Sequence, residues 1–267
     1  MMEKTANDKK LALADLGTDA ENTWCPGCGN FAILTAFKKA IVELHNEGKI
    51  DYRKVVMVTG IGCHGKIADY VKVSSYYTLH GRTLPSAIGI KEANPSLHVV
   101  GFAGDGDAYS EGMEHFIHTC NYDEDLTYIV HNNQIFALTT GQPTATTEMG
   151  LKTKTTPQGK PWRAVNPIAL ALVSGASFVA RGFALEIDHL KDLIKQAILH
   201  KGFSYIDVVM PCISFHNTTQ YFRQHIYKLE DVGHDPTDFD AAMKKAMEWR
   251  YEAEPKGKVP IGVFYKK

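Results

Sequence analysis

Oxygen-bearing side chains follow two apolar runs of this sequence, at positions where strands are expected to end. The segment 104–107 reads GDGD directly after the apolar run 97–103, and an Asn-Asn pair ending at Asn133 closely follows the run 126–130. The Asp105 carboxylate and the Asn133 side-chain carbonyl suit Mg2+, which keeps few protein ligands and takes phosphate oxygens for the rest. The glycines of GDGD let backbone N–H groups approach phosphates closely. The chemistry indicated is a hard cation that holds a diphosphate.

A second glycine-rich loop, GIGCHGK at 60–66, also follows an apolar run. It carries Cys63, His64 and Lys66. Because the carboxyl ends of parallel strands meet at one rim of a sheet, we expect this loop to lie beside Asp105. That placement brings a thiol, an imidazole and an ammonium group to the expected diphosphate site.

A Cys-x-x-Cys pair, Cys25 and Cys28, precedes a stretch with apolar residues at helical spacing. Two thiols at this spacing suit a metal or cluster site, or a redox dithiol, and this segment alone leaves cluster, zinc and dithiol open. Asn30 is expected to cap the helix and Gly48 to end it. Five cysteines, an odd number in a chain without a signal-peptide core, favour metal or redox use over structural disulfides.

The alternation of strand-like and helical patterns predicts an α/β fold, an open and mostly parallel sheet with helices on both faces. The predicted strands are 54–59, 77–80, 97–103, 126–130, 177–180 and 203–210. The predicted helices are 30 to Gly48, 86–93, 108–120, 167–173 and 187–200. The segment 139–159 lacks apolar periodicity, and a loop of that length is expected to act as a lid or a partner surface.

We expect residues 1–211 to form the α/β domain and residues 212–267 to form an extension that packs on that domain or on a partner. Within the extension we predict a helix near 238–251 and an edge strand at 259–265. Residues 1–22 are expected to be a poorly ordered lead-in or an arm lying on a partner.

Composition excludes several classes of protein. With 267 residues and a formal net charge of −1, the chain has no basic balance that would favour nucleic acid or a membrane surface. It contains no apolar run long enough for a transmembrane helix, and its first residues, MMEKTANDKK, lack a signal-peptide core. We therefore expect a cytoplasmic protein.

The GDGD and Asn-Asn segments together resemble the thiamine diphosphate signature. Between Trp24 and Asn217 the chain resembles the β subunit of the 2-oxoacid:ferredoxin oxidoreductases, which have a thiamine diphosphate-binding fold. The matching segments, in the order of the family, are WCPGCGN, GIGCHGK, HGRTLPSAIGIKEANP, the stretch from GDGD to NNQIFALTTGQ, and VVMPCISFHN. The resemblance implies coenzyme A-dependent oxidative decarboxylation of a 2-oxoacid to acyl-CoA and CO2, with electrons passed to ferredoxin.

The resemblance also implies site residues. One [4Fe–4S] cluster is implied at Cys25, Cys28, Cys63 and Cys212, whereas Cys120 matches no ligand position. Mg2+ is implied at Asp105, Asn133 and the backbone carbonyl of Ile135. The implied contacts of thiamine diphosphate are Ile61, Gly62, Cys63, His64, His80, Gly104, Asp105, Gly106, Asp107 and Asn133. The implied catalytic residues are His64, Lys66 and Leu138, of which the last two fall where the family touches the 2-oxoacid.

The partners follow from the same resemblance: ferredoxin, and an α subunit that supplies the activating glutamate, in an α2β2 assembly. Among substrates, 2-oxoglutarate is favoured because Lys66, His64, Thr139 and Thr140 offer polar groups for a second carboxylate. Thr140 stands where many relatives carry Lys or Gly, which leaves pyruvate as an alternative. A cluster-free thiamine diphosphate decarboxylase or synthase would leave four cysteines without a role, and a structural zinc protein or a nucleotide-binding module would not explain the thiamine signature.

Overall fold

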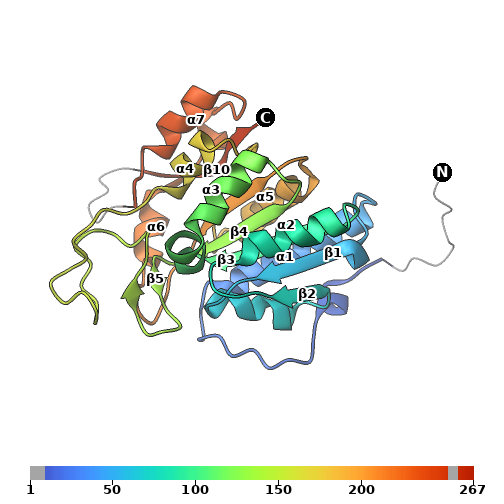
Figure 1. The fold of residues 1–267 in the computed structure, drawn as a ribbon, viewed down its shortest axis with the longest axis horizontal. Helices are drawn as coiled ribbons and strands as arrows, with labels where there is room; N and C mark the ends of the chain where they lie inside the picture. Colours follow the sequence, from blue (N-terminus) through green and yellow to red (C-terminus); the bar gives the residue numbers. More distant parts are fainter. Residues whose placement is uncertain (1–9, 252–257) are drawn as a thin grey trace.

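An eight-stranded sheet forms the centre of the computed structural model, which describes residues 10–251 and 258–267 (Figure 1). Across the sheet the strands are β2 (Ser74–Tyr77), β1 (Val55–Thr59), β3 (His98–Gly104), β4 (Thr127–Asn132), β8 (Ser204–Val209), β7 (Phe178–Phe183), β10 (Val259–Lys266) and β9 (Ile226–Lys228). Neighbouring strands are parallel, except that β10 runs antiparallel to β7. Both β4 and β8 are buried along their whole length, as is usual for strands of a parallel sheet covered on both faces.

Helices cover both faces of this sheet, which confirms the predicted α/β architecture. The helices are α1 (Asn30–Asn46), α2 (Thr83–Ala93), α3 (Met113–Tyr122), α4 (Pro167–Val173), α5 (Ile187–Leu199), α6 (Thr219–His225) and α7 (Phe239–Ala246). One hydrophobic cluster joins α1 and α5 to the first face of the sheet, and a second joins α2, α3, α4 and α7 to the other. None of the described helices is long and apolar enough to cross a membrane.

The strand order places a crevice at one end of the sheet. The chain leaves β1 for the edge strand β2 and then returns to β3 on the other side of β1. Where the order reverses in this way, the connections diverge and leave room outside the carboxyl ends of the strands. The short helix η3 (Cys63–Tyr70) follows β1 at that end, and the π-helical turn η4 (Gly106–Glu111) follows β3.

The helix predicted at 108–120 is wrong in one respect, because it is two elements. The turn η4 ends at Glu111, and α3 begins at Met113, with Gly112 between them. The backbone of Gly81 lies so close that a Cβ on Gly112 would stand 2.7 Å from its carbonyl oxygen. A side chain therefore has no room at position 112, and π-helical turns such as η4 are frequent at functional sites.

The strand predicted at 77–80 is also displaced, because β2 ends at Tyr77. Thr78 donates its backbone N–H to the Thr59 carbonyl at 2.8 Å and still follows the end of β1. Beyond it, Gly81 adopts a positive φ of 73° and donates its N–H to the Asp107 carboxylate at 2.7 Å. The bend therefore brings the Gly81 backbone to the Asp107 carboxylate, at the crevice outside the end of the sheet.

The segment preceding Cys25 packs on the rest of the described chain, so the prediction of a poorly ordered lead-in is wrong for residues 10–22, whereas the alternative of an arm on a partner stays a prediction. Leu11 and Leu16 are buried, and the short helix η1 (Leu13–Leu16) connects them. Leu11 exchanges two hydrogen bonds, each of 2.9 Å, with the Asn46 side chain at the end of α1. Residues 1–9 of that prediction lie outside the described part of the chain.

The strand predicted at 259–265 is present as β10, but its predicted place at an edge is wrong, since β10 lies between β7 and β9 inside the sheet. The predicted tail helix is the shorter α7, and residues 252–257 lie outside the described ranges. Trp249, Tyr251 and Ile261 form a separate hydrophobic cluster with Phe222 of α6 at this side of the sheet. The last part of the chain thus contributes core residues as well as strands.

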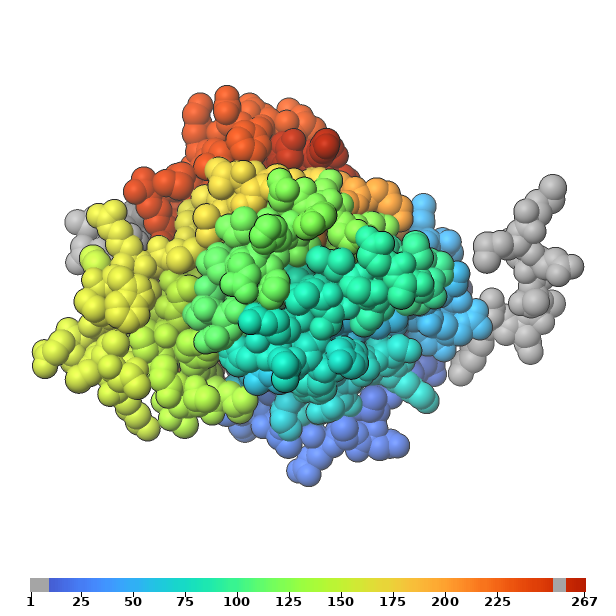
Figure 2. Space-filling view, viewed as in Figure 1, coloured from blue at the N-terminus to red at the C-terminus, as the bar shows by residue number. Residues whose placement is uncertain are grey.

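The loop predicted at 139–159 contains only a two-residue strand, β6 (Gln142–Pro143), paired with β5 (Ile135–Phe136). Around residues 140–165 the chain forms a projection at one side of the molecule, drawn yellow-green in Figure 2. The inner end of this segment is buried, at Thr144, Thr146 and Thr147, whereas its outer part is exposed.

Candidate active site

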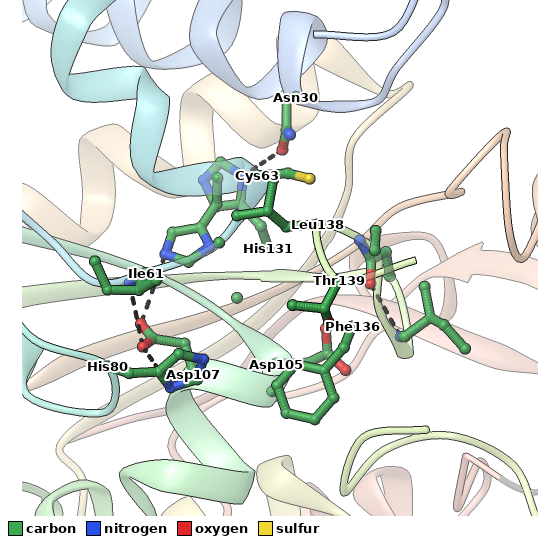
Figure 3. A pocket seen from close by; sticks show the side chains of 17 residues that line it. Asn30, Ile61, Cys63, His80, Asp105, Asp107, His131, Phe136, Leu138 and Thr139 are labelled. Atoms are coloured by element: carbon green, nitrogen blue, oxygen red, sulfur yellow. Dashed lines mark hydrogen bonds and ion pairs between the residues drawn. The ribbon is translucent and has the colours of Figure 1, made fainter. Parts of the chain in front are cut away.

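A cavity of about 90 Å3 lies at the carboxyl ends of β1, β3 and β4 (Figure 3). The three loops predicted to meet at this rim all contribute to its wall. The lining residues are Asn30, Ile61, Gly62, Cys63, His64, His80, Gly104, Asp105, Gly106, Asp107, His131, Asn133, Ile135, Phe136, Ala137, Leu138 and Thr139. Every predicted contact of thiamine diphosphate is in this set, and so are the three predicted Mg2+ ligands; their roles stay predictions.

The Asp107 carboxylate joins its own loop to the loop after β1 and to the bend after β2. Its Oδ1 accepts the backbone N–H of Gly81 at 2.7 Å and that of Ile61 at 3.3 Å. His80 Nδ1 lies 3.3 Å from Oδ1, and His64 Nε2 lies 3.6 Å from Oδ2. Those two ring nitrogens and Asp107 Oδ2 are buried without a hydrogen-bond partner among the described residues. The cavity wall therefore offers polar atoms that are unsatisfied, and such atoms are uncommon in a folded protein.

Asp105 and Asn133 face the same cavity from adjacent strands. Asp105 is 1% exposed, and burial raises the pKa of its carboxyl group to about 6, although a hydrogen bond from Thr146 opposes the rise. The Asn133 Oδ1 atom accepts the N–H of Ile135 at 3.0 Å, which fixes the amide beside the Ile135 backbone. A carboxylate and carbonyl oxygens so placed form a donor set that suits a hard divalent cation.

Close approach explains two glycines of the site. A Cβ on Gly60 would stand 1.8 Å from Asp107 Oδ2, so any side chain there would displace the carboxylate. A Cβ on Gly106 would stand 2.2 Å from the ring of Phe136, which packs over that backbone. The glycines of both loops therefore allow backbone and side chains to meet at the cavity.

His131 and Asn30 are cavity residues that the sequence analysis missed. His131 Nδ1 and Asn30 Oδ1 are 2.8 Å apart, and both residues are buried. Burial lowers the pKa of His131 well below its usual range, and the neighbouring His64 acts in the same direction. The predicted capping role of Asn30 is wrong, because Gly29 occupies the N-cap of α1 and the Asn30 side chain points to His131. His131 stands next to the Asn-Asn pair, and that adjacency was the one signal in the sequence.

A second cavity, of about 320 Å3, adjoins the first. Its wall includes the four cysteines of the predicted cluster, Cys25, Cys28, Cys63 and Cys212, which we call the cavity cysteines. Burial raises the pKa of the Cys63 thiol to about 11, and the other three thiols add repulsion. Within the described ranges no three His, Cys, Asp or Glu side chains converge to hold one metal ion. The thiols instead surround the cavity.

The structure separates the fifth cysteine from this set. Cys120 is fully buried in α3 among apolar side chains on the other side of the sheet, and burial raises its pKa far above the usual range. Lys66 lies in the wall of the cysteine cavity and not in that of the first cavity, whereas Leu138 lines both. Trp24, which donates its indole N–H to the Cys63 carbonyl at 2.6 Å, completes the wall beside Cys25.

Family comparisons cover most of the chain. Residues 60–208 match the family described as thiamine pyrophosphate enzyme, C-terminal TPP binding domain. Residues 212–267 match the family described as the C terminal of the pyruvate ferredoxin oxidoreductase beta subunit. The first match contains the loops of the first cavity, and both matches together contain two of the cavity cysteines.

Individual relatives are similar over nearly the full chain. The 2-oxoacid:ferredoxin oxidoreductase subunit beta of Saccharolobus solfataricus is 47% identical over 91% of this chain and 81% of its own length. The 2-oxoglutarate synthase subunit KorB of Archaeoglobus fulgidus is 39% identical, over 84% and 85% respectively. A solved structure of 2-oxoglutarate:ferredoxin oxidoreductase from Magnetococcus marinus, with 2-oxoglutarate, coenzyme A and succinyl-CoA bound, superposes with a TM-score of 0.90 at 35% identity, covering 97% of this chain and 86% of that one.

Proposed function

Because this chain belongs to the β subunits of the 2-oxoacid:ferredoxin oxidoreductases, we propose that it holds Mg2+ and thiamine diphosphate in the first cavity and a [4Fe–4S] cluster in the second. Together with an α subunit it converts a 2-oxoacid and coenzyme A to acyl-CoA and CO2, and two electrons pass to ferredoxin. The observation that carries the proposal is that Cys63 lines both cavities. One residue thus separates the site of decarboxylation from the site that accepts electrons.

The first cavity fits Mg2+ and thiamine diphosphate. The buried Asp105 carboxylate gains a compensating charge from a divalent cation, and Asn133 with the Ile135 carbonyl completes the protein ligands. The unsatisfied atoms of His64, His80 and Asp107 supply partners for a polar ligand. When bound, thiamine diphosphate supplies the carbon nucleophile that releases CO2 from a 2-oxoacid and retains the electron pair. The residues of this chain bind and orient the cofactor and exclude water around it.

The cysteine cavity fits a cluster. Four thiols on its wall repel one another when ionised, and a bound iron–sulfur cluster offsets that repulsion because thiolates are its ligands. A [4Fe–4S] cluster accepts electrons one at a time. Ser214 donates its hydroxyl to the Cys25 sulfur at 3.6 Å, and hydrogen bonds to ligand sulfurs tune the reduction potential of such clusters. Cys25 is the exposed member of the set, which suits electron exit toward ferredoxin.

In this proposal the site is completed by an α subunit. The first cavity encloses less than the roughly 300 Å3 usual for ligands of drug size. Exposed apolar side chains surround it, with Leu79 78% exposed, Leu138 58% and Ile61 38%. Apolar groups gathered at the rim of a cavity favour a protein partner there. That partner supplies the glutamate that activates the thiamine ring, in an α2β2 assembly.

The substrate proposed is 2-oxoglutarate. The half-buried Lys66 side chain shares the wall of the cysteine cavity with Thr140 and with Leu138, which also lines the first cavity. A cation in that position compensates a substrate carboxylate that would otherwise be buried without a partner. The names of several relatives and the ligands of the Magnetococcus structure support the same acid.

The test is the kcat/KM of the complex reconstituted with its α subunit, coenzyme A and ferredoxin, for 2-oxoglutarate, pyruvate and a branched-chain 2-oxoacid. We expect 2-oxoglutarate to be preferred and the branched-chain acid to be the poorest substrate. Equal use of pyruvate would contradict the assignment. Lys66→Ala should lower kcat/KM for 2-oxoglutarate more than for pyruvate, whereas equal losses would mean that the lysine contacts the carboxylate common to both.

A further inference from the structure

The turn that carries two of the predicted Mg2+ ligands contains a residue in an uncommon conformation. Gln134 lies between Asn133 and Ile135 and has a φ of 61°, in the left-handed region. That region is unfavourable for residues with a side chain, so the turn persists only where its surroundings hold it. Gln134 is also buried, at 3% exposure.

Three hydrogen bonds hold Gln134 in this conformation. Its backbone N–H donates to Asn132 Oδ1 at 3.3 Å, and its side-chain Nε2 donates to the Thr146 carbonyl at 2.9 Å. The Thr147 hydroxyl donates to the Gln134 carbonyl. The turn after β4 is therefore attached to the inner end of the projecting loop as well as to its own strand.

The Thr146 hydroxyl connects this loop to the other predicted ligand. Its Oγ1 lies 2.8 Å from Asp105 Oδ2 and 3.0 Å from Asn132 Oδ1, and all three residues are buried. The hydroxyl has one proton for two acceptors, and a carboxylate is the stronger acceptor. The proton therefore goes to Asp105, while Asn132 Oδ1 accepts the N–H of Gln134.

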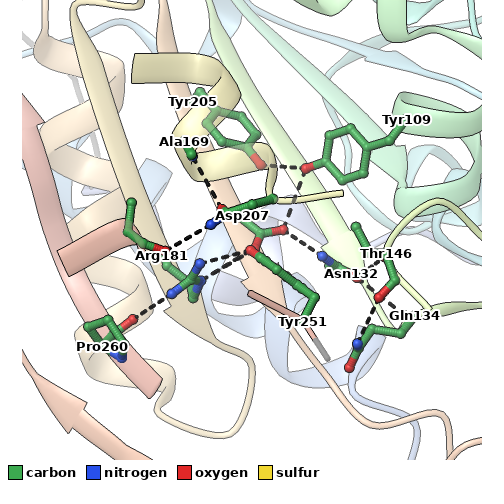
Figure 4. A network of polar contacts seen from close by, with 12 residues as sticks. Tyr109, Asn132, Gln134, Thr146, Ala169, Arg181, Tyr205, Asp207, Tyr251 and Pro260 are labelled. Carbon is green, nitrogen blue, oxygen red and sulfur yellow. Dashed lines mark hydrogen bonds and ion pairs between the residues drawn. The ribbon is translucent and has the colours of Figure 1, made fainter. Parts of the chain in front are cut away.

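Both ends of this arrangement are anchored in the core, and Figure 4 shows the end at Asn132. Asn132 Nδ2 donates to Asp207 Oδ1 at 2.9 Å, and Asp207 lies 3.5 Å from Arg181 with neither side chain exposed. On the loop side, the 1% exposed Lys160 donates its ammonium to the carbonyls of Thr147 and Ala145. These hydrogen bonds hold the inner end of the loop in place.

We propose that Asn132, Gln134 and Thr146 are positioning residues that set the predicted Mg2+ ligands in place before the ion binds. The strained turn aims the Asn133 side chain and the Ile135 carbonyl into the cavity, and the Thr146 hydroxyl orients the Asp105 carboxylate toward them. This inference rests on the proposed function, since it concerns the same Mg2+ and thiamine diphosphate site. The three positioning residues hold the ligands of that site in place without being cofactor ligands themselves.

The test uses the αβ complex stripped of Mg2+ and thiamine diphosphate. Isothermal titration with Mg2+ at saturating thiamine diphosphate gives an apparent Mg2+ dissociation constant without reference to turnover. Thr146→Val should raise it by about 10- to 100-fold, as loss of a partner to a metal ligand does in other sites. Thr146→Ser retains the hydroxyl and should stay close to the wild type. Thr155→Val, an exposed threonine in the same loop, is the matched control.

A second pair of variants tests the strained turn itself. Both Gln134→Gly and Gln134→Ala lose the side-chain hydrogen bond to the Thr146 carbonyl. Glycine adopts the positive φ of this position without strain, whereas alanine retains the strain. We therefore expect tighter Mg2+ binding in Gln134→Gly than in Gln134→Ala. Wild-type affinity in Thr146→Val, or equal affinities in the two Gln134 variants, would overturn the inference. A wild-type complex that binds no thiamine diphosphate with Mg2+ would reject the proposed function instead.

Discussion

Replacing Arg181 with methionine is expected to destabilise the fold by about 3–5 kcal/mol, because it leaves a buried carboxylate without its charge partner. Arg181 Nε lies 3.5 Å from Asp207 Oδ2, and both side chains are 0% exposed. The guanidinium also donates to Tyr251 Oη at 2.9 Å and to the Pro260 carbonyl at 3.1 Å, and it lies 5.0 Å from the centre of the Trp249 ring. The substitution therefore removes these side-chain contacts, while the backbone pairing of β7 with β10 remains.

The assay is thermal unfolding of the purified chain by calorimetry, with iron content matched between variants. At roughly 2 °C per kcal/mol for a chain of this size, the midpoint should fall by about 6–10 °C. The exposed Arg163→Met is the matched control and should change stability by less than about 0.5 kcal/mol. Arg181→Met combined with Asp207→Leu should recover part of the loss, because no unpaired charge then remains.

The loss should also depend on pH. Burial raises the pKa of Asp207 from its usual 3.8, and the Arg181 guanidinium opposes that rise. Without the guanidinium the folded variant retains a proton at pH values where the unfolded chain has released it, so its free energy of unfolding falls as pH rises. The deficit relative to wild type should be larger at pH 8 than at pH 5. A deficit that does not vary with pH, or one no larger than that of Arg163→Met, would refute the reasoning.

Three further predictions test the cofactor sites. Asp105→Ala should lose thiamine diphosphate while its circular dichroism stays unchanged, and full retention would contradict the site. Iron should fall from about four per chain in alanine variants of each of the cavity cysteines, but not in Cys120→Ala, and the reverse pattern would refute the ligand set. Gly106→Ala should weaken thiamine diphosphate binding because its Cβ would stand 2.2 Å from the Phe136 ring; unchanged affinity would mean that the ring moves aside freely.

The first cavity was predictable because its residues follow strands directly. Glycine-rich loops after apolar runs are local signals, and parallel strands bring their carboxyl ends to one rim whatever the rest of the fold does. Asp105, Asn133 and the loop at 60–66 therefore meet as expected. The helices between the strands were also predictable from local signals, and α4 has the predicted bounds 167–173.

The contacts that support the site were not predictable, because they join residues far apart in the chain. Asn30 and His131 are 101 positions apart, and Asn132 and Asp207 are 75 apart. A local pattern assigned Asn30 to helix capping, but a buried partner on β4 used its side chain instead. The role of Thr146 was not predictable either, because a threonine in a polar loop is expected to be exposed. Only the structure shows that this part of the loop is buried.

The last part of the chain shows a different limit. An apolar stretch preceded by polar sequence predicted a strand at 259–265, but nothing local determines which strands it pairs with. The antiparallel pairing of β10 with β7 depends on the buried side chains that both strands share with the C-terminal cluster. The sequence of a segment can indicate that it forms a strand, whereas its position in the sheet depends on packing against the rest of the core.

The central claim is that electrons leave the first cavity through the cysteine cavity of the same chain. The most direct measurement is freeze-quench electron paramagnetic resonance of the αβ complex after addition of 2-oxoglutarate without ferredoxin. We expect the signal of a reduced [4Fe–4S] cluster in the wild type and none in Asp105→Ala, which retains its iron. A signal of equal size in Asp105→Ala, or none in a wild-type complex with both cofactors bound, would contradict the account.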